Sequence, residues 1–417
     1  MRFVVVGAGI SGLVAAYRLR QRFPDAAITI ADAADRVGGK LRSATLAGRG
    51  IDVGAEAFVG RRPEVPALLA ELGLAEQLVH PSGARPLVWA GNALHPLPAG
   101  TLLGIPADAR SLDGLVDPAT RARIDAEPTI PLRWDRGSDT TVGELVGERF
   151  GEQVVSRSVD PLLGGVYAGA SSSIGVRAAV PTLAAALDDG ATSLSDAVSR
   201  ALPPPSTAPV FGGLRDGYQV LLDALVAAAD ADLRLETAVA AIRPRPGGGW
   251  AVDGIGHCDG VILAVPAWSA AELLPGPAGA AAAAIEHSNS ALVALALPVD
   301  TALPVNSGIL VATGEALRAK AFTLSSRKWP HLADGESLVV RASFGRAREQ
   351  LDGWSDDELI AALQRLPGRR YVFTNADDRH AERVLAHLGL ASLFDDVFHI
   401  HSFGFAPKPD PLGFERM

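Results

Sequence analysis

The beginning of the chain limits the possible folds more than any other stretch, because a short apolar run there meets three closely spaced glycines. Residues 3–6 read FVVV, which is typical of a strand buried on both faces of a parallel sheet. Gly7, Gly9 and Gly12 follow immediately in the spacing GxGxxG. Glycines in this spacing allow a tight turn and a close approach of the backbone to a ligand. The pattern predicts a strand that turns directly into a helix.

The residues after the glycines complete this pattern. LVAAYRLRQRF, which begins at residue 13, places apolar side chains on one helical face, and Pro24 ends the helix. AAITIAD, residues 26–32, reads as a second strand ending on Asp32, twenty residues after Gly12. Glycine-loop amides and a helix N-terminus suit a pyrophosphate, and Asp32 is placed to accept hydrogen bonds from a ribose diol. We predict a Rossmann-like α/β domain with a dinucleotide site; the alternative is a glycine-rich turn without a ligand.

Composition excludes several other functions. The chain has 417 residues, a length typical of two or three domains, and a net charge of −9. This charge argues against nucleic acid as the main partner, because phosphate binding needs clustered Lys and Arg. A single cysteine, Cys258, excludes an internal disulfide and a cysteine-built zinc site, and it fits a reducing cytoplasm. The histidines show no metal-ligand spacing, so no metal is expected.

Membrane insertion is not expected either. The sequence contains no apolar run of about 18 residues, the length that predicts a spanning helix. Peripheral contact with a membrane and the oligomeric state are left open by the sequence.

Two further glycine-containing blocks narrow the choice of dinucleotide. DRVGGKL (35–41) follows Asp32 closely, with Arg36 and Lys40 around its glycine pair, and IDVGAEAF (51–58) comes soon afterwards. The arrangement resembles the extended FAD signature of the amine-oxidase-like flavoproteins, which usually carry Glu where this chain has Asp32. The resemblance implies FAD rather than a nicotinamide dinucleotide.

Blocks further along the chain resemble one branch of that group, the protoporphyrinogen/coproporphyrinogen oxidases. They include GRRPEVPALLAELGLAEQLVHP (60–81), LHPLPAGTLLGIPAD (94–108), VDPLLGGVYAGASSSIGVRAAVP (159–181), VFGGLRDGYQVLLDAL (210–225), LPVNSGILVATGEALRAKAFTLSSRKWPH (303–331) and LVVRASFGRA (338–347). The resemblance implies an FAD enzyme of haem biosynthesis that oxidises a porphyrinogen to the porphyrin, with dioxygen as the final acceptor. The flavin then carries the chemistry, and no catalytic side chain is identified. A related flavin amine oxidase or desaturase is the alternative.

The resemblance also implies which residues contact FAD. They are Gly7, Ala8, Gly9, Ile10, Ser11 and Gly12 at the pyrophosphate, Asp32 and Ala33 at the adenosine ribose, Lys40, Gly54, Ala55, Glu56 and Ala57 nearer the flavin, and Val239 in LETAVAAI (235–242), which resembles the strand at the adenine. WAVDGIGHCDGVILAVPAW (250–268) resembles the hairpin and strand that complete the sheet.

The candidates for substrate contact are fewer. Arg61 and Arg62 would bind the propionates of a porphyrinogen, because a guanidinium holds a carboxylate with two hydrogen bonds. GGVYAG (164–169) resembles the substrate-lining loop of the family, where Gly165 and Gly169 would let a flat macrocycle approach. The alternatives are a solvated turn for the arginines and an ordinary glycine-rich connection for the glycines.

These blocks predict a discontinuous FAD-binding domain, about 1–85 and 205–268, and an α+β substrate domain, about 86–204 and 269–362. Residues 364–417 instead resemble a fragment of a haloacid-dehalogenase-type hydrolase of the pyrimidine-nucleotidase kind, beginning with the strand YVFTN. The fragment lacks the nucleophilic aspartate of that group, so phosphatase activity is not expected. Since this segment replaces the usual end of the oxidase family, a truncated fusion without activity is a further alternative.

Overall fold

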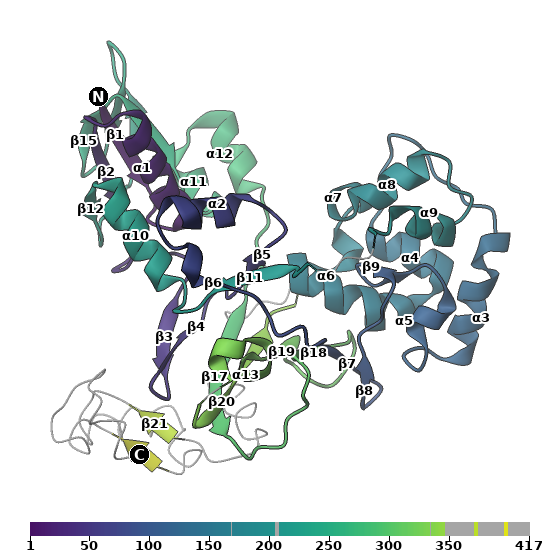
Figure 1. Ribbon diagram of the computed structural model, residues 1–417. Coiled ribbons are helices and arrows are strands. Elements are labelled where there is room, and N and C mark those ends of the chain that lie inside the picture. Colours follow the sequence, from purple (N-terminus) through teal and green to yellow (C-terminus); the bar gives the residue numbers. More distant parts are fainter. Residues whose placement is uncertain (168, 205–207, 334, 347–370, 374–395, 399–417) are drawn as a thin grey trace. The chain divides into compact units, whose positions relative to one another are not determined.

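The computed structural model describes residues 1–346, apart from 168, 205–207 and 334, together with two short strands at 371–373 and 396–398 (Figure 1). The chain forms two compact units. Unit 1 contains 1–81 and 208–287, and unit 2 contains the other residues that the structure describes. The FAD-binding domain proposed from the sequence covers most of unit 1, but helix α12 (Gly276–Ala283), which we assigned to the second domain, belongs to unit 1.

Unit 1 is built on a parallel sheet of four strands. Its order is β12 (Asp232–Arg234), β2 (Ala27–Ala31), β1 (Arg2–Val6) and β16 (Gly260–Leu263). Val5 lies opposite Ile30 on one side and Ile262 on the other. The strands predicted at 3–6 and 26–32 are therefore confirmed as β1 and β2, and β16 confirms that the chain returns to this sheet after residue 250.

Two helices cover one face of the sheet. They are α1 (Ile10–Arg22), which confirms the helix predicted after the glycines, and α10 (Gln219–Ala229) (Figure 1). Their apolar faces pack on the side chains of β1 and β2 that point toward them, including Val5 and Ile30. Burial of this face is the main source of stability for short amphipathic helices.

A small antiparallel sheet covers the other face. It consists of β13 (Ile242–Pro244), β14 (Trp250–Val252) and β15 (Gly256–Cys258), and the hairpin of β14 and β15 confirms the predicted one. Val4 and Val6 of β1 pack there against Val252 and Cys258. The three valines of the run FVVV are thus buried, as the sequence predicts, and Phe3 is partly buried.

The remaining elements of unit 1 are short. They are β3 (Ser43–Leu46) and β4 (Arg49–Asp52), which form a hairpin, then β5 (Phe58–Val59), α2 (Glu64–Glu71), η1 (Ala75–Gln77), β6 (Leu78–Val79), β11 (Phe211–Leu214) and α11 (Ala267–Leu273). β11 pairs with both β5 and β6.

Unit 2 combines a six-stranded mixed sheet with a helical part. The sheet order is β17 (Ala291–Pro298), β20 (Ser337–Phe344), β19 (Ala321–Leu324), β18 (Gly308–Val311), β7 (Leu87–Ala90) and β8 (Ala93–Pro96). The helices are α3 (Pro118–Ala126), α4 (Val142–Phe150), α5 (Glu152–Val154), α6 (Asp160–Tyr167), α7 (Val176–Ala179), α8 (Pro181–Asp188), α9 (Leu194–Ala201) and α13 (Ser325–Lys328). The short elements are β9 (Thr101–Leu102), β10 (Ile105–Pro106), η2 (Ala109–Leu112), η3 (Glu127–Thr129), the π-helical turn η4 (Val155–Val159), η5 (Ser171–Ser173) and η6 (Pro330–Leu332).

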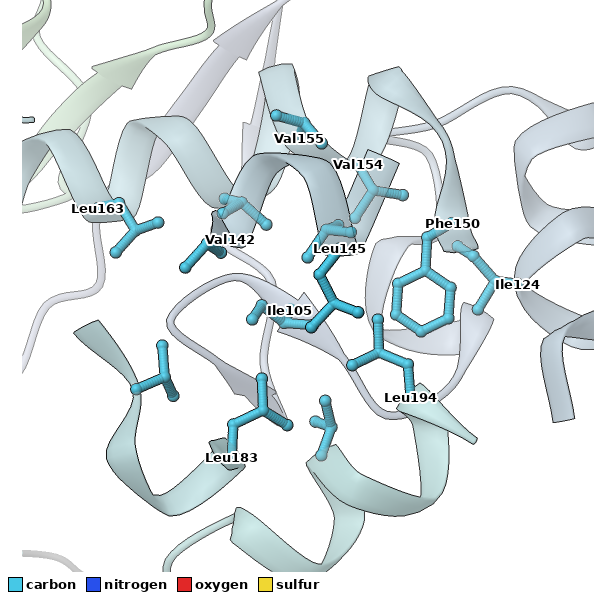
Figure 2. Close-up of a cluster of buried hydrophobic side chains, with 14 of the residues drawn as sticks. Ile105, Ile124, Val142, Leu145, Phe150, Val154, Val155, Leu163, Leu183 and Leu194 are labelled. Carbon is cyan, nitrogen blue, oxygen red and sulfur yellow. The ribbon is translucent and has the colours of Figure 1, made fainter. Parts of the chain in front are cut away.

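The helical part of unit 2 has its own apolar core (Figure 2). Phe150 of α4 is fully buried there among Ile124 of α3, Ile105 of β10 and Leu194 of α9. Sequence signals set the helix starts: Thr141 and Glu144 form a capping box at α4, and Ser193 caps α9.

One buried ion pair lies in this helical part. Glu127 is completely buried and accepts hydrogen bonds from Arg149 Nε (2.8 Å), Leu194 N (2.7 Å) and Ser195 N (3.1 Å). Burial alone would disfavour the charged carboxylate, but these bonds outweigh it, so the pKa of Glu127 lies below its usual value. The pair therefore joins α4 to the start of α9.

Two observations concern the remaining predictions on the chain. In the part of the chain that the structure describes, no helix is long and apolar enough to cross a membrane. The strand predicted at YVFTN is confirmed as β21 (Tyr371–Phe373), which pairs in parallel with β22 (Asp396–Phe398). The rest of 364–417 lies outside the described residues, and no finding supports the hydrolase-like fragment there.

Candidate functional site

The glycine loop between β1 and α1 requires glycine at two of its three positions. Gly7 has φ +108°, and a Cβ on it would lie 2.4 Å from the carbonyl oxygen of Ala264. A Cβ on Gly12 would lie 1.8 Å from the carbonyl oxygen of Gly7. Gly9 differs, because the nearest atom to its added Cβ is 3.9 Å away. The backbone is thus tightly packed at Gly7 and Gly12, whereas there is open space next to Gly9, as a ligand-binding loop needs.

The N-terminus of α1 begins at this loop and has no side-chain cap. Gly9 is its N-cap residue, no side chain caps the helix, and the first turn contains no acidic residue. The backbone N–H groups of Ile10, Ser11 and Gly12 therefore belong to the uncapped first turn, where the helix dipole favours an anion. This arrangement fits the pyrophosphate of a dinucleotide.

Asp32 follows β2 and reaches the same loop. Its Oδ2 accepts a hydrogen bond from Ala8 N (2.6 Å), and its Oδ1 accepts one from Ala34 N (2.8 Å). A carboxylate oxygen can accept more than one hydrogen bond, so both atoms retain capacity for a ribose hydroxyl. Asp32 therefore anchors the glycine loop through Ala8. The next residue, Ala33, is exposed.

Asp32→Ala is expected to weaken the binding of both FAD and ADP by about tenfold or more, because hydrogen bonds to a charged group are worth about 1.5–3 kcal/mol. Equilibrium titration of the two ligands would measure the change. Asp25→Ala, an exposed aspartate before β2, is the control and should leave both affinities unchanged. Equal affinities in Asp32→Ala and the control would show that Asp32 takes no part in the site.

The second glycine pair packs directly on the first loop. Gly38 N donates to Ala8 O at 2.9 Å, and the backbone at Gly38 bridges to Gly9. Arg36 donates to the carbonyl oxygens of Val37, Gly39 and Leu41, so its guanidinium holds this turn together. Lys40 is exposed at the end of the turn.

The next predicted block, Gly54, Ala55, Glu56 and Ala57, lies in the loop between β4 and β5. Gly54 N donates to Arg42 O at 3.1 Å, and Ala55 N donates to Lys40 O at 3.2 Å. A Cβ on Gly54 would lie 2.2 Å from Lys40 O, so the two segments are in close contact. Backbone contacts therefore run continuously from the glycine loop through 38–42 to 54–55.

Val239 does not lie on a strand. β12 ends at Arg234 and Glu236 has φ +51°, so the strand predicted at 235–242 is wrong except for Ile242, the first residue of β13. Thr237 N donates to Asp32 O at 2.8 Å, which keeps this segment beside the end of β2. Val239 itself is half-buried against the core beneath β14 and β15.

The two groups of substrate candidates lie in different units. Arg61 and Arg62 are exposed in the turn between β5 and α2 of unit 1, where Arg62 N donates to Val59 O at 3.1 Å. Gly165 is exposed in unit 2, and an added Cβ on it would meet no atom within 4 Å. A Cβ on Gly169 would lie 2.5 Å from Ile174 Cδ1.

The loop predicted at GGVYAG is wrong in its first part. Residues 164–167 form the end of α6, because the helix that starts at Asp160 runs through both glycines as far as Tyr167. Glycine lowers helix stability by only about 1 kcal/mol, which tertiary packing easily offsets. Gly169 lies after the helix and is half-buried.

Sequence reasoning missed one cluster beside this site. Asp52, Ser43 and Tyr218 meet at the end of β4, where Asp52 Oδ1 accepts hydrogen bonds from Ser43 Oγ (2.6 Å) and Tyr218 N (3.1 Å). Asp52 lies in the block IDVGAEAF, which the sequence analysis singled out. Its partner Tyr218 comes from a distant part of the sequence, so the contact could not be predicted.

Similarity to known proteins identifies the class to which this site belongs. The family of flavin-containing amine oxidoreductases matches residues 10–378, and the chain belongs to this family. Membership implies a flavin cofactor, which the cradle at Gly9 and the uncapped helix fit.

Individual relatives are more specific. The chain is 54% identical over 370 residues to a coproporphyrinogen III oxidase of Mycobacterium leprae, with 86% of this chain and 81% of the relative covered. The corresponding protein of Mycobacterium tuberculosis (strain H37Rv) is 52% identical over 380 residues, with 87% and 82% covered. A solved structure named as a protoporphyrinogen oxidase from Exiguobacterium sp. 255-15 has a TM-score of 0.78 and 26% identity, and the match covers 100% of this chain and 96% of that one. These relatives support the porphyrinogen-oxidase branch that the sequence blocks resemble.

Proposed function

We propose that the chain is an FAD-dependent oxidase that converts a porphyrinogen to the porphyrin in haem biosynthesis, with coproporphyrinogen III as the first candidate and protoporphyrinogen IX as the second. The observation that carries this proposal is the 54% identity over 370 residues to a coproporphyrinogen III oxidase. The dinucleotide cradle in unit 1 supports it independently.

Different residues of this chain would bind different parts of the cofactor. The first-turn amides of α1 would bind the pyrophosphate, Asp32 the ribose, and the loop 54–57 the flavin end. When bound, FAD supplies hydride-type oxidation of a bridging carbon, and dioxygen is the proposed final acceptor. The protein then needs to orient the macrocycle and exclude side reactions, which explains why no catalytic side chain is required.

The test is to purify the chain with added FAD and to supply each porphyrinogen in air. The expected result is bound flavin absorbance, porphyrin fluorescence and peroxide formation, with a higher kcat/KM for coproporphyrinogen III. Bound flavin that is bleached by an amine, with no porphyrin formed, would favour the amine-oxidase alternative. A folded protein that binds no flavin would favour the fusion without activity.

The double variant Arg61→Ala with Arg62→Ala is expected to raise the KM for coproporphyrinogen by about tenfold, because charge-assisted hydrogen bonds to the propionates are lost. Flavin affinity and kcat should change little, since both side chains are exposed and the backbone of the turn is unaffected. Steady-state kinetics would measure the split between KM and kcat.

The matched control for this double variant is Arg243→Ala with Arg245→Ala, two exposed arginines of which one lies in β13 and the other directly after it. It removes the same charge from the same unit. If both double variants raise KM equally, net charge rather than local recognition is responsible, and Arg61 and Arg62 form only a solvated turn.

A further inference from the structure

We propose that Asp52 is a positioning residue for the flavin end of the cofactor, acting together with Ser43 and Tyr218. The inference rests on the proposed function and goes beyond it, because these three residues would position the loop 54–57 rather than bind the dinucleotide themselves. They come from β3, β4 and the start of α10, all within unit 1.

Asp52 joins three segments of the chain at one atom. Its Oδ1 accepts a hydrogen bond from Ser43 Oγ across the β3–β4 hairpin and a second from Tyr218 N at the start of α10. Gly217, just before Tyr218, has φ +78°, and a Cβ on it would lie 3.1 Å from both Asp52 Oδ1 and Ser43 Oγ. The turn before α10 is therefore shaped to approach this carboxylate closely.

The side chain of Tyr218 is buried next to this turn. It is only 4% exposed and packs in the core beneath α10. Burial raises the pKa of its phenol, and the negative charges of Asp52 and Glu56 raise it further.

The loop begins two residues after Asp52, so the position of Asp52 sets where the loop starts. Val53 N donates to Arg42 O at 2.8 Å, and Gly54 N donates to the same oxygen. The pyrophosphate end has separate anchors, namely the hydrogen bonds of Asp32 and Gly38 to Ala8. The two ends of the site are thus held by different residues, and a change at Asp52 should affect only one of them.

The experiment compares the binding of FAD with that of ADP, which has the adenosine and pyrophosphate but no flavin. Asp52→Ala is expected to weaken FAD binding about tenfold and to leave the ADP affinity within twofold of the wild type. Asp52→Asn should restore most of the FAD affinity, because its amide oxygen still accepts hydrogen bonds from Ser43 and Tyr218. Bound flavin in Asp52→Ala should also be more fluorescent, since its ring is held less firmly.

Two further variants make the result decisive. Asp253→Ala, an exposed aspartate in the turn between β14 and β15, is the control and should change neither affinity. Ser43→Ala removes one donor to Asp52 and should weaken FAD binding about threefold with ADP unchanged; it decides the question if Asp52→Ala does not fold.

The inference is overturned if Asp52→Ala, or Ser43→Ala in its place, weakens FAD and ADP equally or weakens neither. An equal loss would mean that the cluster only stabilises unit 1. The proposed function fails in a different way, namely if the wild type binds FAD but forms no porphyrin. In that case a selective loss of FAD affinity in Asp52→Ala would still support the positioning role.

Discussion

Gly12→Ala should abolish detectable flavin binding, with at least a hundredfold loss of FAD affinity. The added Cβ would lie 1.8 Å from the carbonyl oxygen of Gly7. No change of side-chain rotamer can relieve this clash, because the position of a Cβ is fixed by its own backbone and the oxygen belongs to the backbone of the loop. Either α1 moves away from the sheet or the loop opens, and each change displaces the amides that face the pyrophosphate. Overpacking of this kind also costs about 1–3 kcal/mol of stability. Titration with FAD and a thermal melt of the same sample would separate the two effects.

Gly50→Ala is the control for this prediction. Gly50 lies in the β3–β4 hairpin of the same unit, and an added Cβ there would meet no atom within 4 Å. It should bind FAD as the wild type does. If Gly12→Ala keeps wild-type affinity, the loop does not hold a dinucleotide in the manner described here, and the function proposed above loses its structural support.

Glu127→Ala should cause the largest loss of stability, about 3–5 kcal/mol, because it leaves the guanidinium of Arg149 buried without its carboxylate. The N–H groups of Leu194 and Ser195 would lose their acceptor at the same time. Urea denaturation followed by circular dichroism would measure the change in the free energy of unfolding. Glu148→Ala, an exposed glutamate on α4, is the control and should change it by less than about 0.5 kcal/mol. Equal stability of the two variants would contradict the prediction.

The same residue predicts a pH dependence. The pKa of Glu127 is lower in the folded protein than in the unfolded chain, so its contribution is complete above the unfolded value, about 4.3, and is lost as the pH falls through the folded value. Glu127→Gln, which has no charge to titrate, should therefore lose less stability than the wild type between neutral and acid pH. Parallel acid-denaturation curves for the two proteins would contradict this expectation.

Local sequence patterns predicted the part of unit 1 in which neighbours in sequence are neighbours in space. The run FVVV, the glycine spacing and the acid at Asp32 specify β1, the loop, α1 and β2 within about thirty residues, and the structure confirms each of them. Chain geometry alone brings Asp32 to the loop, because parallel strands β1 and β2 end at the same edge of the sheet.

The failures have different physical causes. Gly164 and Gly165 suggested a loop, but they lie within α6, which packs on the core of unit 2 through Leu163. The segment after β12 was expected to continue as a strand, yet Glu236 takes a left-handed conformation and turns the chain. Asp52 and Tyr218 are separated by 166 positions in the sequence. Periodic patterns of apolar residues cannot predict a contact over such a separation.

The central sheet of unit 1 is built from strands that lie far apart in the sequence. β1 and β2 are made within the first 31 residues, whereas β12 and β16, which flank them, come only after residue 231. At roughly 5–20 residues per second, a ribosome needs tens of seconds to make the intervening chain. During that time the growing protein must keep two apolar strands from pairing wrongly, and the sheet that carries the glycine loop is complete only after translation has passed β16.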